Sequence, residues 1–267
     1  MATALQRVTP NTRYTTTFLA ILRRDITVTL REFPAFLAQV ILQPLGLLFI
    51  FGRVLADLGF TRPGYAAQLF PGIVALTLVT TALQGVALPL VIEFSFTKEI
   101  EDRLLAPMPI WLVAVEKVVF AALRALVAAA MMFPVGVLVL GTIPFVSGTI
   151  GWLLVFSLLG ALTGGAMGMT LGTVVTPQKI NLVFAIVLTP LLFTGCTQYP
   201  WPSLDRLRWF QALTLLNPMT YVSEGVRAAL IPDGPHMSTW VALVLLCGSL
   251  VIFLWLGVRG FVRRAVD

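Results

Sequence analysis

Residues 125–178 read ALVAAAMMFPVGVLVLGTIPFVSGTIGWLLVFSLLGALTGGAMGMTLGTVVTPQ and carry no charged side chain over 54 positions. A helix crosses the hydrocarbon core of a bilayer with about 20 residues, so this stretch is long enough for two crossings. A turn signal, Gly141-Thr142-Ile143-Pro144 followed by Ser147-Gly148, lies between its two halves. The stretch therefore predicts two membrane-spanning helices joined by a short turn.

The composition of the whole chain agrees with this interpretation. Of the 267 residues 58% are hydrophobic and 11% are charged, whereas soluble domains carry about 25% charged residues. This excludes a soluble enzyme and a disordered chain. The net charge of +6 is spread between apolar runs, so it indicates membrane topology and not a nucleic-acid partner. Two cysteines and one histidine leave little for a disulfide framework or a metal site, and we predict no metal site.

The remaining charge-free runs complete the count of crossings. We expect an all-α polytopic membrane protein, with residues 1–33 as an N-terminal cytoplasmic segment and residues 34–267 as the transmembrane domain. Six transmembrane helices are predicted, at residues 34–54, 65–92, 112–141, 149–175, 179–195 and 238–260.

The distribution of Lys and Arg predicts which side each loop faces. With the N-terminus inside, 12 basic residues fall in cytoplasmic segments and five outside, and Arg124, near the inner end of the third helix, adds to the inner count. Because cytoplasmic loops carry the basic excess, both termini are expected in the cytoplasm. Arginines interrupt the N-terminal region, so we expect no cleavable signal peptide. An excess of Arg over Lys hints at a GC-rich bacterial genome and carries no more than that. We expect the protein in the bacterial inner (plasma) membrane, as a multi-pass protein.

Residues 14–33 predict an amphipathic helix. Leu19, Leu22, Ile26, Leu30 and Phe33 follow at steps of three and four, and basic side chains fall on the opposite face. Such a helix is suited to the cytoplasmic headgroup layer. Two interpretations remain open: the helix only anchors the first span, or it also contacts a cytoplasmic subunit.

The loop at residues 93–109, EFSFTKEIEDRLLAPMP, is the densest charge cluster of the chain. A short acidic helix with a leucine pair, ended by prolines, is suited to docking in a groove on another protein. The alternative is a solvated turn between two spans. The residues that would make the contact are Lys98, Glu99, Glu101, Asp102, Arg103, Leu104 and Leu105.

Residues 196–230 are too polar to span a membrane, yet they hold many aromatic and leucine side chains. Asn217-Pro218 divides them into two short helices, which we expect to dip into the outer leaflet as a re-entrant pair. Glu224 and Arg227 are three residues apart and are predicted to form an ion pair. A structural role is favoured for this pair over a place in a substrate site.

Polar side chains within the spans are candidates for a substrate pathway, because such residues usually face the bundle interior or a cavity. The alternative is ordinary hydrogen bonding between helices, which contributes about 0.6 kcal/mol each. A separate stripe, Gly160, Gly164, Gly168 and Gly172, predicts a close approach of another helix within the subunit. The polar candidates are Gln39, Gln43, Thr77, Thr80, Thr81, Gln84, Asn181 and Thr189.

Two motifs resemble the ABC-2-type permeases, the membrane subunits of a class of ATP-driven exporters. One is Glu101-Asp102-Arg103-Leu104-Leu105-Ala106-Pro107-Met108-Pro109, followed by Val115-Glu116-Lys117-Val118. The other is Leu216-Asn217-Pro218-Met219-Thr220-Tyr221, followed by Glu224-Gly225-Val226-Arg227. The resemblance covers nearly the whole chain and is closest to the daunorubicin-resistance and lipooligosaccharide-export type. Many members carry a Gly-Thr pair in the coupling loop, which this chain lacks.

The resemblance implies a mechanism and a set of partners. Two permeases, either two copies or one with a sister permease, enclose a path lined by the first, second and fifth spans. Two cytoplasmic ATPase subunits bind ATP and Mg and move the coupling loops at 93–109. The chain has no Walker A pattern, so the ATPase must be a separate polypeptide and no cofactor is expected in this chain.

Amphiphilic substrates, such as a drug, a lipid or a lipid-linked saccharide, are expected to leave the cytoplasm or the inner leaflet, in contact with membrane lipid. Two rival classes fit less well. An intramembrane enzyme needs a nucleophile with a base, or paired carboxylates, and we predict no catalytic residue. An ion-coupled secondary transporter places an acid or a histidine at mid-membrane, and the predicted span centres contain neither.

Overall fold

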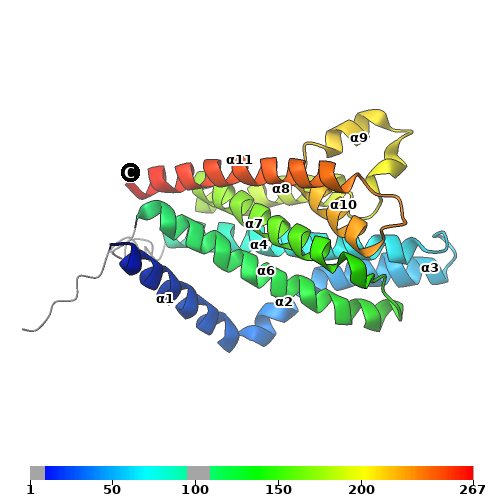
Figure 1. Cartoon of the computed structure of the whole chain (residues 1–267), viewed down its shortest axis with the longest axis horizontal. Coiled ribbons are helices and arrows are strands. Elements are labelled where there is room, and N and C mark those ends of the chain that lie inside the picture. Colours follow the sequence, from blue (N-terminus) through cyan, green and yellow to red (C-terminus); the bar gives the residue numbers. More distant parts are fainter. Residues whose placement is uncertain (1–9, 95–108, 267) are drawn as a thin grey trace, which may run out of the picture.

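The computed structural model describes residues 10–94 and 109–266, and within these ranges the secondary structure is helical, with no strand. The long elements run roughly parallel or antiparallel to one another (Figure 1). The α-helices are α1 (Pro10–Arg31), α2 (Phe33–Leu47), α3 (Leu55–Asp57), α4 (Tyr65–Ile92), α6 (Ile110–Leu140), α7 (Ile150–Val174), α8 (Ile180–Thr194), α9 (Arg208–Thr214), α10 (Pro218–Leu230) and α11 (Thr239–Val266). A π-helix, η1 (Leu48–Val54), joins α2 to α3, and single 3₁₀ turns lie at Ser147–Thr149, Pro177–Lys179 and Trp201–Leu204.

Five helical segments in the described ranges are long and apolar enough to cross a membrane: Phe33–Asp57, Tyr65–Ile92, Ile110–Leu140, Ser147–Val174 and Thr239–Ala265. They coincide with five of the six predicted spans. The fifth predicted span is α8, which has only 15 residues and is shorter than the roughly 20 that a perpendicular crossing needs. The membrane-protein class is therefore confirmed, and the sixth span stays a prediction.

The bundle has two chemically different ends. At one end α11 finishes, α4 finishes and α6 begins (Figure 1, left), and the described basic residues Lys117, Arg259, Arg263 and Arg264 lie in these helix ends. We call it the basic end. At the other end lie α3, the starts of α4 and α11, and the short helix α9. We call it the α9 end.

Helix α4 is the central element of the bundle. It packs against α6, α7 and α10, and two-thirds of its most apolar window is buried (67%). The stripe of glycines on α7 permits this packing. A Cβ atom on Gly168 would lie 2.3 Å from the carbonyl oxygen of Leu83, and one on Gly164 would lie 2.7 Å from that of Val79. Only glycine lets the two backbones approach so closely.

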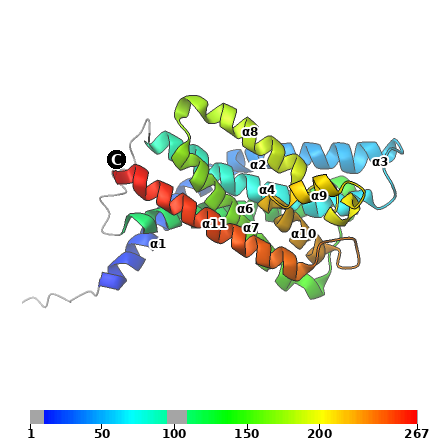
Figure 2. The ribbon, with the colours of Figure 1, turned by 90° about the horizontal axis from the view of Figure 1, so that it is seen from above.

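Helix α1 is separated from the first span by a sharp bend. Pro34 in the first turn of α2 has no N–H to continue the hydrogen-bond ladder, so α1 ends at Arg31 and α2 begins at Phe33. Figures 1 and 2 show α1 running obliquely along the basic half of the bundle. Tyr14, Phe18 and Ile21 pack on a small core that includes Val113 and Phe261.

The apolar face predicted for residues 14–33 is divided in the structure. Leu19 and Leu30 are exposed, at 60% and 63% of their surface, and the residues that pack on the bundle are the neighbouring Tyr14, Phe18 and Ile21. The cause is rotational: the side of α1 that meets α6 is shifted from the leucine stripe. The exposed leucines are then available to lipid, and the place of α1 in the headgroup layer stays a prediction.

The segment at 196–230 forms two helices, α9 and α10, separated at Asn217, in agreement with the Asn-Pro signal. Asn217 caps α10, because its side-chain oxygen accepts from the N–H of Met219 at 3.0 Å. Its amide nitrogen donates to the carbonyl of Leu191 at 3.0 Å and so ties α10 to the end of α8. Every residue of α10 is buried, whereas α9 lies at the surface.

Candidate functional site

A cavity with two adjoining chambers lies between the α1–α2 bend on one side and α4 and α6 on the other. The first chamber has a volume of about 440 Å³ and the second of about 210 Å³. The chambers share five lining residues, Phe36, Gln39, Gly85, Pro89 and Arg124. The cavity exists because the bend after Arg31 holds α1 away from α4, so no large side chain fills the space between them.

Five of the eight polar residues predicted for the pathway come together in the second chamber. Gln39 and Gln43 line it from α2, and Thr80, Thr81 and Gln84 line it from α4. In the described part of the chain, the amide groups of the three glutamines make no hydrogen bond to protein. They are free to bind a guest molecule or water.

Two of the other three candidates, Thr77 and Thr189, do not line either chamber. Thr77 is completely buried in the core, where its hydroxyl donates to the carbonyl of Ile73 at 2.8 Å. Thr189 is exposed on α8, away from the cavity. The side chain of Asn181 lies outside the described residues. The two faces of α2 and α4 thus meet, and the face of α8 does not join them.

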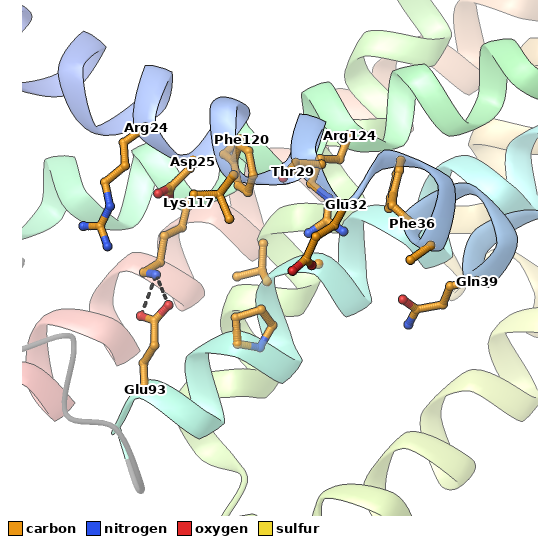
Figure 3. A pocket seen from close by; sticks show the side chains of 15 residues that line it. Arg24, Asp25, Thr29, Glu32, Phe36, Gln39, Glu93, Lys117, Phe120 and Arg124 are labelled. Atoms are coloured by element: carbon orange, nitrogen blue, oxygen red, sulfur yellow. Dashed lines mark hydrogen bonds and ion pairs between the residues drawn. The ribbon is translucent and has the colours of Figure 1, made fainter.

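The guanidinium of Arg124 lies at the boundary of the two chambers. Its Cζ atom stacks on the ring of Phe36 at 4.5 Å and lies 5.7 Å from that of Phe120. Figure 3 shows this group pointing into the space between the α1–α2 bend and α4. Its Nε atom is buried and has no hydrogen-bond partner among the described residues. Arg124 is a single cation on an otherwise apolar stretch of α6.

The first chamber opens at the basic end, where a buried ion pair joins α4 to α6. Lys117 Nζ lies 2.7 Å from Glu93 Oε1 and 2.6 Å from Oε2, and both side chains are about nine-tenths buried. Figure 3 shows the pair at the wall of the chamber. Glu93 is the first residue of the segment 93–109 predicted to couple to an ATPase, and it is among the last described residues before residue 95.

Phe94 and Arg264 connect the same point to α7 and α11. The ring of Phe94 packs edge-on against Phe261 at 5.6 Å, and the guanidinium of Arg264 stacks on it at 4.8 Å. Arg264 also donates to the carbonyls of Gly172 at 3.0 Å and Thr173 at 3.2 Å, at the end of α7. The end of α4 is therefore fixed to three other helices. The predicted coupling residues, Lys98, Glu99, Glu101, Asp102, Arg103, Leu104 and Leu105, lie outside the described residues.

Glu224 and Arg227 form a buried ion pair far from the cavity, at the α9 end. The carboxylate of Glu224 accepts from Arg227 Nη1 and also from the backbone N–H groups of Trp201 at 3.0 Å and Met237 at 2.6 Å. Arg227 donates in turn to the carbonyl of Cys196 at 2.8 Å. Cys196 has a φ of 51°, in the left-handed region, and this bond helps to hold it there. The network joins four segments of backbone and lines neither chamber.

Sequence reasoning missed Arg124, Phe36 and the Glu93–Lys117 pair as parts of one site. Arg124 was available as a signal, because it is the only charge between Lys117 and Lys179. A charge inside an apolar span usually faces a cavity or a partner. Within the described ranges no cluster of three or more His, Cys, Asp or Glu residues could hold a metal ion.

Comparisons with known proteins identify the family of the chain. The chain matches the family described as ABC-2 type transporter over residues 16–231, which is most of its length. It is similar to the "Putative transport permease ycf38" of Cyanophora paradoxa, with 26% identity over 217 residues that cover 78% of this chain and 72% of the relative. The match includes both motifs that carried the resemblance, since both lie within the matched range. The chain therefore belongs to the ABC-2 type transporter family.

Proposed function

We propose that this protein is the transmembrane permease subunit of an ATP-binding-cassette exporter that moves amphiphilic molecules. The family supports a transport permease, and the chain carries no Walker A pattern of its own. ATP and Mg would be bound by two separate cytoplasmic ATPase subunits. The observation that carries the proposal is the two-chamber cavity, which is lined by polar side chains from two membrane-spanning helices and extends to the Glu93–Lys117 pair.

The positions of Glu93 and Phe94 suggest how an attached motor would act on the cavity. These residues lie between α4, which supplies Thr80, Thr81 and Gln84 to the cavity, and the loop at 95–108. A displacement of the loop would pull on Glu93 and hence on Lys117 of α6. Because Lys117 and Glu93 both line the first chamber, its width would change with the loop position.

The basic end would face the cytoplasm, since cytoplasmic segments carry the excess of Lys and Arg. Both termini and the segment 95–108 would then lie on the side of the ATPases, in a bacterial plasma membrane. A second copy of the chain, or a sister permease, would complete the substrate path. Substrate would then enter the first chamber from the cytoplasm or the inner leaflet.

An ion-coupled secondary transporter is the rival proposal, and the state of Glu224 argues against it. An ion carrier needs a carboxylate that can bind and release its ion. Glu116 and Glu224 are the completely buried acids of the described chain, and Glu116 lies in the second turn of α6, outside the centre of that span. Arg227 and two backbone N–H groups occupy the oxygens of Glu224, so this carboxylate is not available to bind and release an ion.

Co-purification tests the proposal directly. The tagged chain is expressed at native level in its own host, extracted in mild detergent, and the bound proteins are identified by mass spectrometry. We expect a stoichiometric polypeptide with a Walker A motif, and a second permease if the complex is a heterodimer. A triple variant, E99Q/E101Q/D102N, should lose most of the ATPase.

The control is D205N, which neutralises an exposed acid at the α9 end and should retain the ATPase. Repeated isolation of the intact chain without any ATPase would contradict the proposal and favour the ion-coupled transporter. Retention of the ATPase by the triple variant would contradict only the docking role of the loop and would leave the proposed export function standing.

A further inference from the structure

We propose that the second chamber binds the anionic headgroup of an amphiphile, a phosphate or a carboxylate, and that Arg124 is the residue that recognises its charge. The inference rests on the proposed function and narrows its substrate class. It also assigns a role to a side chain that sequence patterns treat only as a topology marker.

The guanidinium of Arg124 lacks a counter-charge in the described chain. It stacks on Phe36 and Phe120, and it forms no ion pair with any described carboxylate. Its buried Nε atom has no hydrogen-bond acceptor there. Arg124 is half-buried, and a charged side chain on a membrane-spanning helix usually faces a cavity, a partner or a substrate pathway.

The charges of the two chambers differ, and the difference points to an anion in the second one. Besides the shared Arg124, the first chamber is lined by three acidic and two basic residues, Asp25, Glu32, Glu93, Arg24 and Lys117. In the second chamber Arg124 is the only charged residue of the described lining. The positive charge of the cavity is therefore concentrated where the two chambers meet, and the second chamber holds no carboxylate to compete with an anion for Arg124.

The neutral groups of the second chamber suit the same guest. The amides of Gln39, Gln43 and Gln84 can donate hydrogen bonds to the oxygens of a phosphate or carboxylate. A planar guanidinium can bind two such oxygens at once, and stacking on Phe36 fixes its plane. Val40, Pro44 and Leu88 supply apolar wall for the chain that carries the headgroup.

The depth of Arg124 favours a headgroup over a freely dissolved ion. Helix α6 has 31 residues and ends at Leu140 at the α9 end. A crossing of about 20 residues, counted back from Leu140, would begin near residue 120. Arg124 would then lie about one turn inside the hydrocarbon region on the basic side, next to the lipid headgroups of that leaflet.

A binding experiment on the purified full-length chain tests the inference. The probe is a fluorescent short-chain phosphatidic acid, and the reference is the uncharged diacylglycerol with the same chains and label. Fluorescence anisotropy in neutral detergent gives the two Kd values. We expect the acid to bind at least about tenfold more tightly than the neutral lipid, and R124Q to remove most of that preference.

The matched control is R259Q. Arg259 also stacks on an aromatic ring, that of Trp255 at 5.3 Å, and it lies on α11 outside both chambers, so the variant removes the same charge elsewhere. We expect its Kd for the acid to change by less than about twofold. R124K keeps the charge without the planar fork and should lie between R124Q and the parent.

The outcomes separate the possibilities. Equal binding of the acid and the neutral lipid by the parent chain would overturn the inference without any variant, so a folding defect of R124Q could not obscure the result. If inorganic phosphate displaces the phosphatidic acid at comparable concentration, the ligand of the second chamber is a free anion and not an amphiphile, and the inference is overturned in that respect. The assay requires no ATPase, and the co-purification does not involve Arg124, so each proposal can fail while the other stands.

Discussion

The buried Glu224–Arg227 ion pair at the α9 end has a structural role. Both side chains are almost completely buried, at 0% and 1% exposure, and every oxygen of the carboxylate has a donor. Breaking a buried ion pair by removing one partner costs about 3–5 kcal/mol, because the other charge is left without compensation. Exposed helical pairs contribute far less.

The first prediction compares two ion pairs of similar helical spacing. E224Q should lower the thermal midpoint of the purified chain strongly, because Arg227 and two backbone N–H groups then face a neutral amide. D57N removes the partner of Arg53 in an exposed pair with an N–O distance of 3.0 Å, and should shift the midpoint little. Thermal unfolding in detergent, followed by tryptophan fluorescence, measures both. Equal shifts would show that the buried network is not a stability determinant.

At the scale of helices, the contact of α4 with α7 sets how rigid the centre of the bundle is. A lipid-facing bundle gains little from the hydrophobic effect between its helices, so stability comes from close packing. Gly164 and Gly168 place α7 directly on the backbone of α4, and Gly257 and Gly260 on α11 leave room for the side chains of Met169 and Thr173 on α7. Helix α4, which forms one wall of the cavity, is therefore supported by its close contact with α7.

The second prediction tests this packing. In G168A the new methyl group would lie 2.3 Å from the carbonyl oxygen of Leu83, which is backbone and cannot turn away. Overpacking of this kind costs about 1–3 kcal/mol, so the thermal midpoint should fall. In the control G248A, on α11, the methyl group meets nothing within 4 Å, and the midpoint should stay the same or rise. A tolerated G168A would contradict the close contact of α4 and α7.

The sequence was sufficient for the long helices and for one face of the site, for identifiable reasons. A charge-free run of 20 residues or more is a strong signal. Four such runs, one of them the 54-residue run that contributes to two helices, became the five long apolar helices, and a fifth run became α8. The spacing of Gln39 with Gln43 placed both on one face of α2, but could not show which helix that face meets. That depends on the bend at Pro34, a tertiary consequence of a single proline.

Thr77 and α8 show where sequence reasoning fails. A threonine in a helix can satisfy its hydroxyl on the carbonyl four residues earlier, as Thr77 does on Ile73, so its polarity is no sign of a cavity. In α8 the uncharged run was long, but the helix ends at Thr194. There Gly195 and Cys196 turn the chain. The hydroxyls of Thr220 and Ser223 on α10 donate hydrogen bonds to the carbonyls of Thr194 and Gly195.

At the scale of the whole molecule, the two ends predict an orientation. The third prediction uses single cysteines in a C247S background, in which the remaining Cys196 is buried. D233C lies at an exposed position of the α9 end and should react with a membrane-impermeant maleimide added to intact spheroplasts. R263C lies at an exposed position of the basic end and should react only after the membrane is permeabilised. The reverse pattern would invert the topology.

The carboxylate of Glu224 also has a consequence for the order of synthesis. Its ligands come from Trp201, Arg227 and Met237, and Met237 is made last, at the threshold of α11. On the ribosome the first nine-tenths of the bundle can be inserted while one carboxylate oxygen still lacks a donor, and only the arrival of residue 237 closes the site. A nascent chain that ends before residue 237 would leave Oε2 of Glu224 without its hydrogen-bond donor, the backbone N–H of Met237.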